Sequence, residues 1–216
     1  MGLRAEPPSL QGCSMMTAVA PRKEPVIFSQ VVEALFKHAI KRERFDESTR
    51  KRLKTIGIDL DQPFLVAYSI PTWFAAINVC AEVLHPDLPS EQARYRLGRQ
   101  LVDGYGQTTM GRAVFAMLRM LGWERSLTRI SRGLQSGTNY LAARTRFLDE
   151  NTLEMIFEVI PEFHTALGPQ PGIDPYFMNG TMDGMMALVG APFAGGELQP
   201  LEPGAQHVVY VLRRKG

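Results

Sequence analysis

The hydrophobic period of the chain changes from helical to alternating close to residue 137, and this change limits the fold more than any other feature. Before it, apolar residues recur every three or four positions in five segments between residues 32 and 133, which is the period of amphipathic helices. After it, TNYLAARTRFLDENTLEMIFEVI (138–160) alternates apolar and polar residues around an Asp-Glu-Asn turn, which is typical of a β-hairpin. The sequence therefore predicts an N-terminal helical layer followed by a small antiparallel sheet, an α+β fold.

Capping residues and prolines set the boundaries of the predicted helices. Asp46 is a good N-cap for a helix that ends at Gly57, and VIFSQVV (26–32) suits a short strand or the approach to a helix. Pro71 fits the first turn of a mostly buried helix, which Pro86 ends. The remaining predicted helices are 89–106 with Ser90 as N-cap, 110–122 ending at Gly122, and 123–133 ending at Gly133.

A further helix separates two hairpins in the second half. PYFMNGTMDGMMALVG (175–190) follows Asp174, a good N-cap, and has Pro175 in its first turn. Gly190 ends this helix and Pro192 blocks its continuation. The chain then closes with ELQPLE and HVVYVLRR on either side of a Pro-Gly turn, so the expected order is hairpin–helix–hairpin.

Residues 26–216 are expected to form a single α+β domain. Residues 1–25 show no hydrophobic periodicity and contain Pro7, Pro8 and Pro21 among polar residues, so we expect a disordered leader there. The Met15-Met16 pair offers an alternative translation start to Met1.

Methionines line one stripe of the helix predicted over 175–190. Met178, Met182 and Met185 fall on one face with Val189. Thioethers select Cu(I), so one hypothesis is a copper site, but no histidine accompanies them in the motif. We favour the alternative, in which methionines fill an irregular core or line a pocket, because this side chain adapts to gaps.

Two glycines lie on the adjoining face of the same helix. Each costs a helix about 1 kcal/mol relative to alanine, so a compensating role is expected for Gly180 and Gly184. We expect a strand or another helix to pack very close to this face.

Composition narrows the class of protein. With 45% hydrophobic and 21% charged residues, the 216-residue chain suits a globular domain, and no apolar run reaches the roughly 20 residues of a membrane span. No secretory signal is visible and the two cysteines make no disulfide framework, so we expect a cytoplasmic location.

Eight Lys/Arg residues fall between Lys37 and Lys54, whereas residues 147–212 hold nine acidic residues and no Lys or Arg. We interpret the basic run as a solvated helix face and do not expect nucleic-acid binding.

No motif indicates a reaction. Phosphate-binding glycine motifs are absent, the four histidines stand singly, and Gln135-Ser136-Gly137 lacks the strand–turn–helix context of a hydrolase nucleophile. Cys80 lies among apolar residues of a predicted helix, where a thiol behaves as a small hydrophobe. We therefore predict a non-enzymatic protein, with no metal site and no cofactor assigned.

GIDPYFMNGTMDGMMALVGAP (172–192), followed by a hairpin that ends in HVVYVLRR, resembles the C-terminal unit of the H-NOX, 4-vinyl-reductase and TRAPP-subunit superfamily. RLGRQLVDGYGQTTMGRAVFAML (96–118) resembles helices of the same superfamily. More closely, residues 26–216 resemble an uncharacterised myxobacterial domain-of-unknown-function family of the DUF2378 type. The resemblance implies an apolar ligand between the helices and the sheet.

The two haem-binding features that the resemblance implies are missing from this sequence. The place of the H-NOX proximal histidine holds Glu124 or Arg125. A Y-x-S-x-R motif is absent before the methionine helix; Tyr140 and Arg144 have a similar spacing but lie one hairpin too early and lack the serine. The resemblance to TRAPP subunits suggests a second possibility, an acyl chain on Cys80.

The sequence thus leaves two main hypotheses. The first is a small-molecule-binding regulatory domain with an apolar pocket between the helices and the sheet, for which Tyr140, Arg144 and Met182 are the candidate ligand contacts. The second is an interaction or scaffold module, homodimeric or bound to a protein partner.

Overall fold

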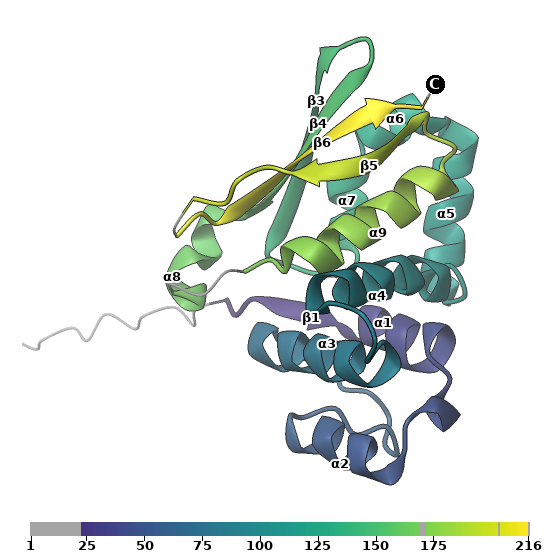
Figure 1. The fold of residues 1–216 in the computed structure, drawn as a ribbon, viewed down its shortest axis with the longest axis vertical. Helices are drawn as coiled ribbons and strands as arrows, with labels where there is room; N and C mark the ends of the chain where they lie inside the picture. Colours follow the sequence, from purple (N-terminus) through teal and green to yellow (C-terminus); the bar gives the residue numbers. More distant parts are fainter. Residues whose placement is uncertain (1–22, 169–171, 203, 216) are drawn as a thin grey trace, which may run out of the picture.

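Helices form most of the first two thirds of the chain, and a four-stranded sheet together with α9 forms most of the last third (Figure 1). The computed structural model describes residues 23–168, 172–202 and 204–215. Its first part contains β1 (Val26–Phe28), α1 (Ser29–Glu33), a π-helix η1 (Ala34–Ala39), a short 3-10 helix η2 (Arg42–Arg44), α2 (Glu47–Thr55), β2 (Ala67–Ser69), α3 (Ile70–Leu84), α4 (Ser90–Tyr105), α5 (Thr109–Leu121), α6 (Trp123–Leu127) and α7 (Ile130–Gln135). Its second part contains β3 (Leu141–Asp149), β4 (Thr152–Val159), η3 (Pro161–Phe163), α8 (His164–Leu167), α9 (Pro175–Leu188), β5 (Phe193–Leu198) and β6 (His207–Arg214).

The larger sheet is antiparallel throughout, with the strand order β3-β4-β6-β5. The first hairpin turns where the sequence predicts it, and Asn151 donates its backbone N–H to Asp149 Oδ1 at 2.7 Å. The α+β prediction, with hairpin, helix and hairpin in the second part, is confirmed. A smaller sheet pairs β1 with β2, so VIF at 26–28 is a strand before it leads into α1.

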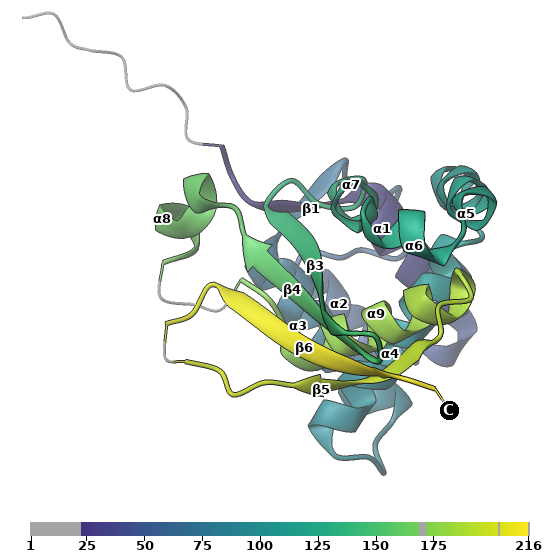
Figure 2. The ribbon, with the colours of Figure 1, turned by 90° about the horizontal axis from the view of Figure 1, so that it is seen from above.

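The elements lie in layers (Figure 1). α9 packs against the inner face of the sheet, where Met155, Phe157 and Tyr210 are buried. α4 crosses α9 on the side away from the sheet, and α1, η1 and α3 lie beneath α4. Seen from above, α5 lies to one side of the four-stranded sheet and does not cover it (Figure 2). It contacts α4 and α6. The hydrophobic core therefore runs from the lower helices through α4 and α9 to the sheet.

The crossing of α4 and α9 is so close that backbone meets backbone. A Cβ atom on Gly180 would overlap the carbonyl oxygen of Tyr95, and one on Gly98 would overlap the carbonyl oxygen of Phe177. This confirms the close packing expected of the glycine face of α9 and identifies the partner as a helix. Gly184 faces the side chain of Val102 at the next turn.

Most of the predicted helix boundaries are confirmed. Asp46 Oδ1 accepts from Thr49 N at 2.7 Å, and Asp174 Oδ1 accepts from the first backbone N–H groups of α9. Two predictions were wrong. Pro89 is the N-cap of α4 and Ser90 is its first residue, because the chain is extended at Pro89 and turns helical only after it. The segment 123–133 breaks into α6 and α7, and Gly133 lies inside α7.

The predicted leader is described only at its end, since residues 1–22 lie outside the described residues, and so do Met15 and Met16. At residues 23–25 the backbone is tied to the domain, because the Glu24 carbonyl accepts from Asn139 Nδ2 at 2.8 Å. Among the described helices, none is both long enough and apolar enough to cross a membrane.

Candidate functional site: an apolar pocket between helices and sheet

A pocket of about 140 Å³ opens between the helices of the first part and the α9–sheet layer. Its described walls come from β1, α1, α3, α4, α5, α7, β3, β4 and α9. The lining residues are Ile27, Val31, Trp73, Phe74, Leu101, Val102, Tyr105, Val114, Phe115, Ile130, Gly133, Leu134, Ser136, Gly137, Thr138, Tyr140, Leu141, Phe157, Ile173, Asp174, Phe177, Met178, Thr181, Met182 and Met185. Most are apolar, and several on α5 and α7 are half-buried, so the pocket is not sealed on that side.

The methionine stripe of α9 forms one wall. Met178 and Met182 are buried and Met185 is half-buried; all three line the pocket. The terminal methyl group of Met182 also packs against Gly196 of β5, so this side chain fills the space between the pocket and the sheet. Phe177, one turn earlier, meets the ring of Trp73 edge-on at 5.8 Å. Adaptable and aromatic side chains therefore share this wall.

Two of the three sequence-predicted contacts line the pocket. Met182 does so from α9, and Tyr140 does so from just before β3, with its hydroxyl donating to the Gly172 carbonyl at 2.8 Å. Arg144 does not, and its placement on a strand face turned toward the helices was wrong. It lies on the outer face of the sheet, where it is exposed and pairs with Glu158 at 3.2 Å. The inner face of β3 carries Leu141 and Ala143, because successive residues of a strand point to opposite faces.

A second tyrosine contributes the main polar feature of the wall. Tyr105 Oη lies 2.9 Å from Ser136 Oγ, which in turn donates to the Gly133 carbonyl at 2.6 Å. Burial raises the pKa of the Tyr105 hydroxyl, so it stays protonated at neutral pH. Tyr105 follows Leu97 and Leu101 at helical spacing, but no local pattern in the sequence indicates that Ser136, at the end of α7, would meet it.

Among the described lining residues one carboxylate, that of Asp174, reaches the wall, and its charge is already balanced. Asp174 caps α9 and pairs with Arg94 of α4 at 3.2 Å. Arg94 lies over the ring of Tyr176, 5.3 Å from its centroid. The carboxylate therefore serves the α4–α9 contact.

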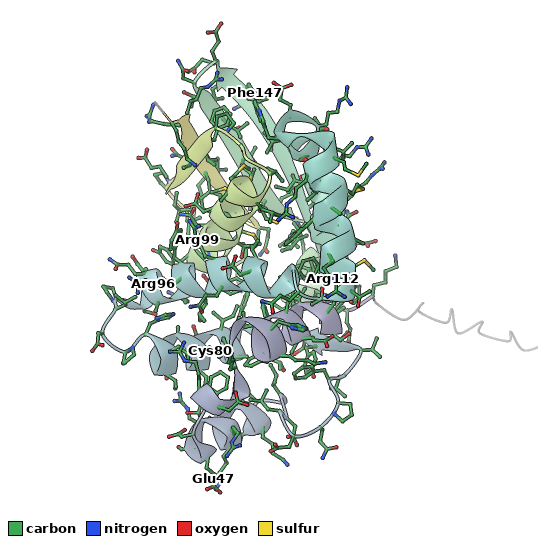
Figure 3. The ribbon with its side chains drawn as sticks, turned by 90° about the vertical axis from the view of Figure 1, so that its right-hand side faces the viewer. Glu47, Cys80, Arg96, Arg99, Arg112 and Phe147 are labelled. Carbon is green, nitrogen blue, oxygen red and sulfur yellow. The ribbon has the colours of Figure 1, made fainter. Side chains whose placement is uncertain are left out.

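Cys80 and the histidines are absent from the described lining of the pocket. Cys80 is fully buried in α3, in the lower helical layer (Figure 3), and burial raises the pKa of its thiol. A protonated thiol away from the pocket gives no support to an acyl chain on Cys80 that fills it. In the described part of the chain, no three His, Cys, Asp or Glu side chains come together as a metal site would require.

An exposed apolar patch lies outside the pocket, near the turn of the first hairpin. It consists of Met117 and Met120 of α5 with Phe147 and Leu148 of β3, and their exposed fractions range from 44% to 89%. Trp123 stands beside Phe147, with 6.4 Å between ring centroids. Figure 3 shows Phe147 near the upper end of the sheet and Arg112 at the opposite end of α5. We call these four exposed residues the α5–hairpin patch.

A helical layer, an α9 helix against a four-stranded antiparallel sheet, and an apolar pocket between them define an H-NOX-like domain. A mutant H-NOX protein from S. oneidensis in the Fe(II) ligation state superposes with a TM-score of 0.57 at 12% identity, covering 88% of this chain and 97% of that one. A double-substituted Tt H-NOX superposes with a TM-score of 0.56 at 13% identity, covering 87% and 94%. At these identities the similarity shows the fold alone.

The chain belongs to the family described as "Protein of unknown function (DUF2378)", which matches residues 25–213. No curated protein matches its sequence. The resemblance to the DUF2378 family and the H-NOX-like fold are confirmed, whereas the myxobacterial origin and the resemblance to 4-vinyl reductases and TRAPP subunits stay predictions.

Haem does not fit the residues that line this pocket. Its iron is usually held by histidine, by cysteine thiolate, by methionine with histidine, or by tyrosine. The described lining contains no histidine or cysteine, and the hydroxyls of Tyr105 and Tyr140 are engaged in the hydrogen bonds above. It also contains no lysine or arginine to face propionates. The pocket volume is close to that of an engineered cavity that holds benzene, about 150 Å³.

Proposed function

We propose that this protein is a non-enzymatic regulatory domain that binds a small apolar molecule in the pocket between the helices and the sheet. The observation that carries the proposal is a pocket of about 140 Å³ with apolar walls, three methionines among them. Ligand sites are concave, mostly apolar and provided with few polar groups, and methionine adapts to ligands of different shape. An H-NOX protein from S. oneidensis is described in an Fe(II)NO ligation state, so the same fold accommodates a bound group in that protein.

Benzene is the probe that matches the pocket in size and polarity. Because a ligand that binds only the folded state stabilises it by mass action, benzene should raise the melting temperature in a concentration-dependent way. Calorimetric titration of the full chain measures the affinity directly. Absence of both heat and thermal stabilisation near the solubility limit of benzene would contradict the proposal.

Filling the pocket should remove binding at little cost in stability. Val114 lines the pocket from α5 and is half-buried, so in Val114→Phe the added ring can occupy pocket space. We expect at least about a tenfold loss of benzene affinity and a stability change below about 1 kcal/mol, measured by urea unfolding.

The matched control is Val208→Phe, at a buried position of β6 that lines neither described pocket. There the same enlargement has no free space, so it should cost about 1–3 kcal/mol and leave benzene affinity within twofold. Equal stability costs at the two positions would show that the space at Val114 is already filled.

A second candidate function, self-association, is favoured by the α5–hairpin patch. Large apolar side chains exposed on one part of the surface commonly mark protein interfaces. Residues 109–135 carry five arginines and one acidic residue, and the turn of the first hairpin carries the exposed Asp149 and Glu150. These two parts of the surface complement each other in charge, so we propose a second copy of the chain as the partner.

Met120→Glu tests this self-association, because Met120 is 89% exposed and should lie within the interface. Sedimentation velocity from micromolar to submillimolar concentrations should show dimers of the native chain and at least a tenfold weaker dimer for the variant. Leu201→Glu, at an exposed apolar residue of the β5–β6 connection, should leave the dimer unchanged. A native chain that stays monomeric over the whole range would exclude this candidate.

A further inference from the structure

We propose that the pocket selects an uncharged ring compound with one hydroxyl group, whose hydrogen is accepted by Tyr105 Oη. This inference rests on the proposed ligand-binding function and adds the chemical class of the ligand. It follows from the charges on the pocket wall and from the use of each hydroxyl hydrogen in it.

The charges of the wall exclude anionic ligands. Asp174 is the only charged side chain among the described lining residues, and it is satisfied by two backbone N–H groups and Arg94. A carboxylate or phosphate in the pocket would have no cation within the described wall. Burying a charge without a partner is costly, so a neutral ligand is favoured.

The hydroxyl groups of the wall, Tyr105 aside, already use their hydrogens within the protein. Thr138 donates to the Val26 carbonyl at 2.9 Å, and Thr181 donates to the Phe177 carbonyl at 3.0 Å. Tyr140 donates to the Gly172 carbonyl at 2.8 Å, and Ser136 donates to the Gly133 carbonyl at 2.6 Å. Since a hydroxyl has a single hydrogen, none of these four can donate to a ligand without breaking a protein hydrogen bond.

The direction of the hydrogen bond between Tyr105 and Ser136 follows from the other bond that Ser136 makes. Its oxygen lies 2.9 Å from Ser136 Oγ, and the serine hydrogen is directed to the Gly133 carbonyl. Tyr105 must therefore be the donor in its bond with Ser136, which leaves its own lone pairs free to accept. A ligand hydroxyl satisfies this wall because it can donate its hydrogen to Tyr105 Oη.

The test compares four ring compounds on the full-length chain by calorimetric titration: benzene, phenol, anisole and ethylbenzene. Anisole keeps the oxygen of phenol but has no hydrogen to donate, and ethylbenzene has the size of anisole without oxygen. We expect phenol to bind about five- to tenfold more tightly than anisole, the value of one neutral hydrogen bond. Anisole should bind no more tightly than ethylbenzene.

Tyr105→Phe locates the acceptor. This variant should lose the phenol preference, about five- to tenfold in affinity, so that phenol binds no more tightly than anisole. Tyr95→Phe is the matched control, because Tyr95 donates to Asp183 at the α4–α9 crossing and does not line the pocket. Its preference for phenol should be unchanged.

The outcomes separate the two proposals. If benzene and phenol both fail to bind, the proposed ligand-binding function fails and this inference falls with it. If benzene binds but phenol binds no better than anisole, the hydroxyl inference is overturned and the pocket-binding function stands. If Tyr105→Phe and Tyr95→Phe weaken phenol equally, Tyr105 is not the acceptor and the inference is again overturned.

Discussion

Replacing Gly180 or Gly98 with alanine is expected to destabilise the protein strongly. In each case the new Cβ would overlap a backbone carbonyl oxygen of the facing helix, Tyr95 O or Phe177 O. Side chains can move aside to relieve overpacking, but two helix backbones can separate only if the whole α4–α9 interface opens. We therefore expect a cost of at least about 3 kcal/mol, the upper end for overpacked sites, or failure to fold.

Gly133→Ala is the matched control for these variants. Gly133 lies inside α7, and its added Cβ would meet no heavy atom within 4 Å. The helix propensity of alanine should then stabilise the protein by about 0.5–1 kcal/mol. Urea unfolding monitored by circular dichroism measures all three variants. A Gly180→Ala protein within 1 kcal/mol of the native chain would show that α4 and α9 do not cross at backbone contact.

Met182→Ala is expected to have the second largest effect, and to act on both stability and binding. Met182 is 1% exposed and packs between the pocket and Gly196 of β5. Its truncation should cost about 2–5 kcal/mol, the range for large-to-small changes in a core. The space released joins the pocket, so ligands larger than benzene should gain affinity.

Urea unfolding gives the stability change, and titration with naphthalene gives the change in ligand size preference. Naphthalene should bind Met182→Ala at least about tenfold more tightly than it binds the native chain. Met110→Ala, at a 48% exposed position of α5 outside the pocket, should change stability by less than about 0.5 kcal/mol and leave naphthalene affinity unchanged. A destabilised Met182→Ala without the gain in naphthalene affinity would place Met182 in the core but not at the pocket.

Local signals were sufficient for most of the elements. Asp46 and Asp174 cap helices, and the alternation around Asp149 forms a hairpin, because capping and turn formation involve residues within four positions of each other. Ser90 and Gly133 were placed wrongly for a related reason. A serine can cap a helix or begin one, and a glycine can end a helix or lie inside it; the backbone on both sides decides.

The pocket was predicted less completely. The stripe of Met178, Met182 and Met185 could be read from one helix, so the wall it forms was foreseeable. Arg144 was assigned to the wrong face of the sheet. The face to which a strand residue points depends on the register with the neighbouring strands, and a shift of one residue moves every side chain to the other face. The contact between Tyr105 and Ser136 spans 31 residues and two helices, and no local pattern predicts it.

By itself the sequence determined the change from helical to strand period, the capped methionine helix, and the need for a close neighbour at Gly180. These properties depend on the spacing of apolar residues along the chain and on the size of each side chain, both of which are local. Only the tertiary structure decided that the neighbour is α4, that Arg144 faces outward, and that Tyr105 meets Ser136 in the wall of the pocket. These results depend on which segments far apart in the sequence pack against each other. Many different packing arrangements are compatible with the same local sequence pattern.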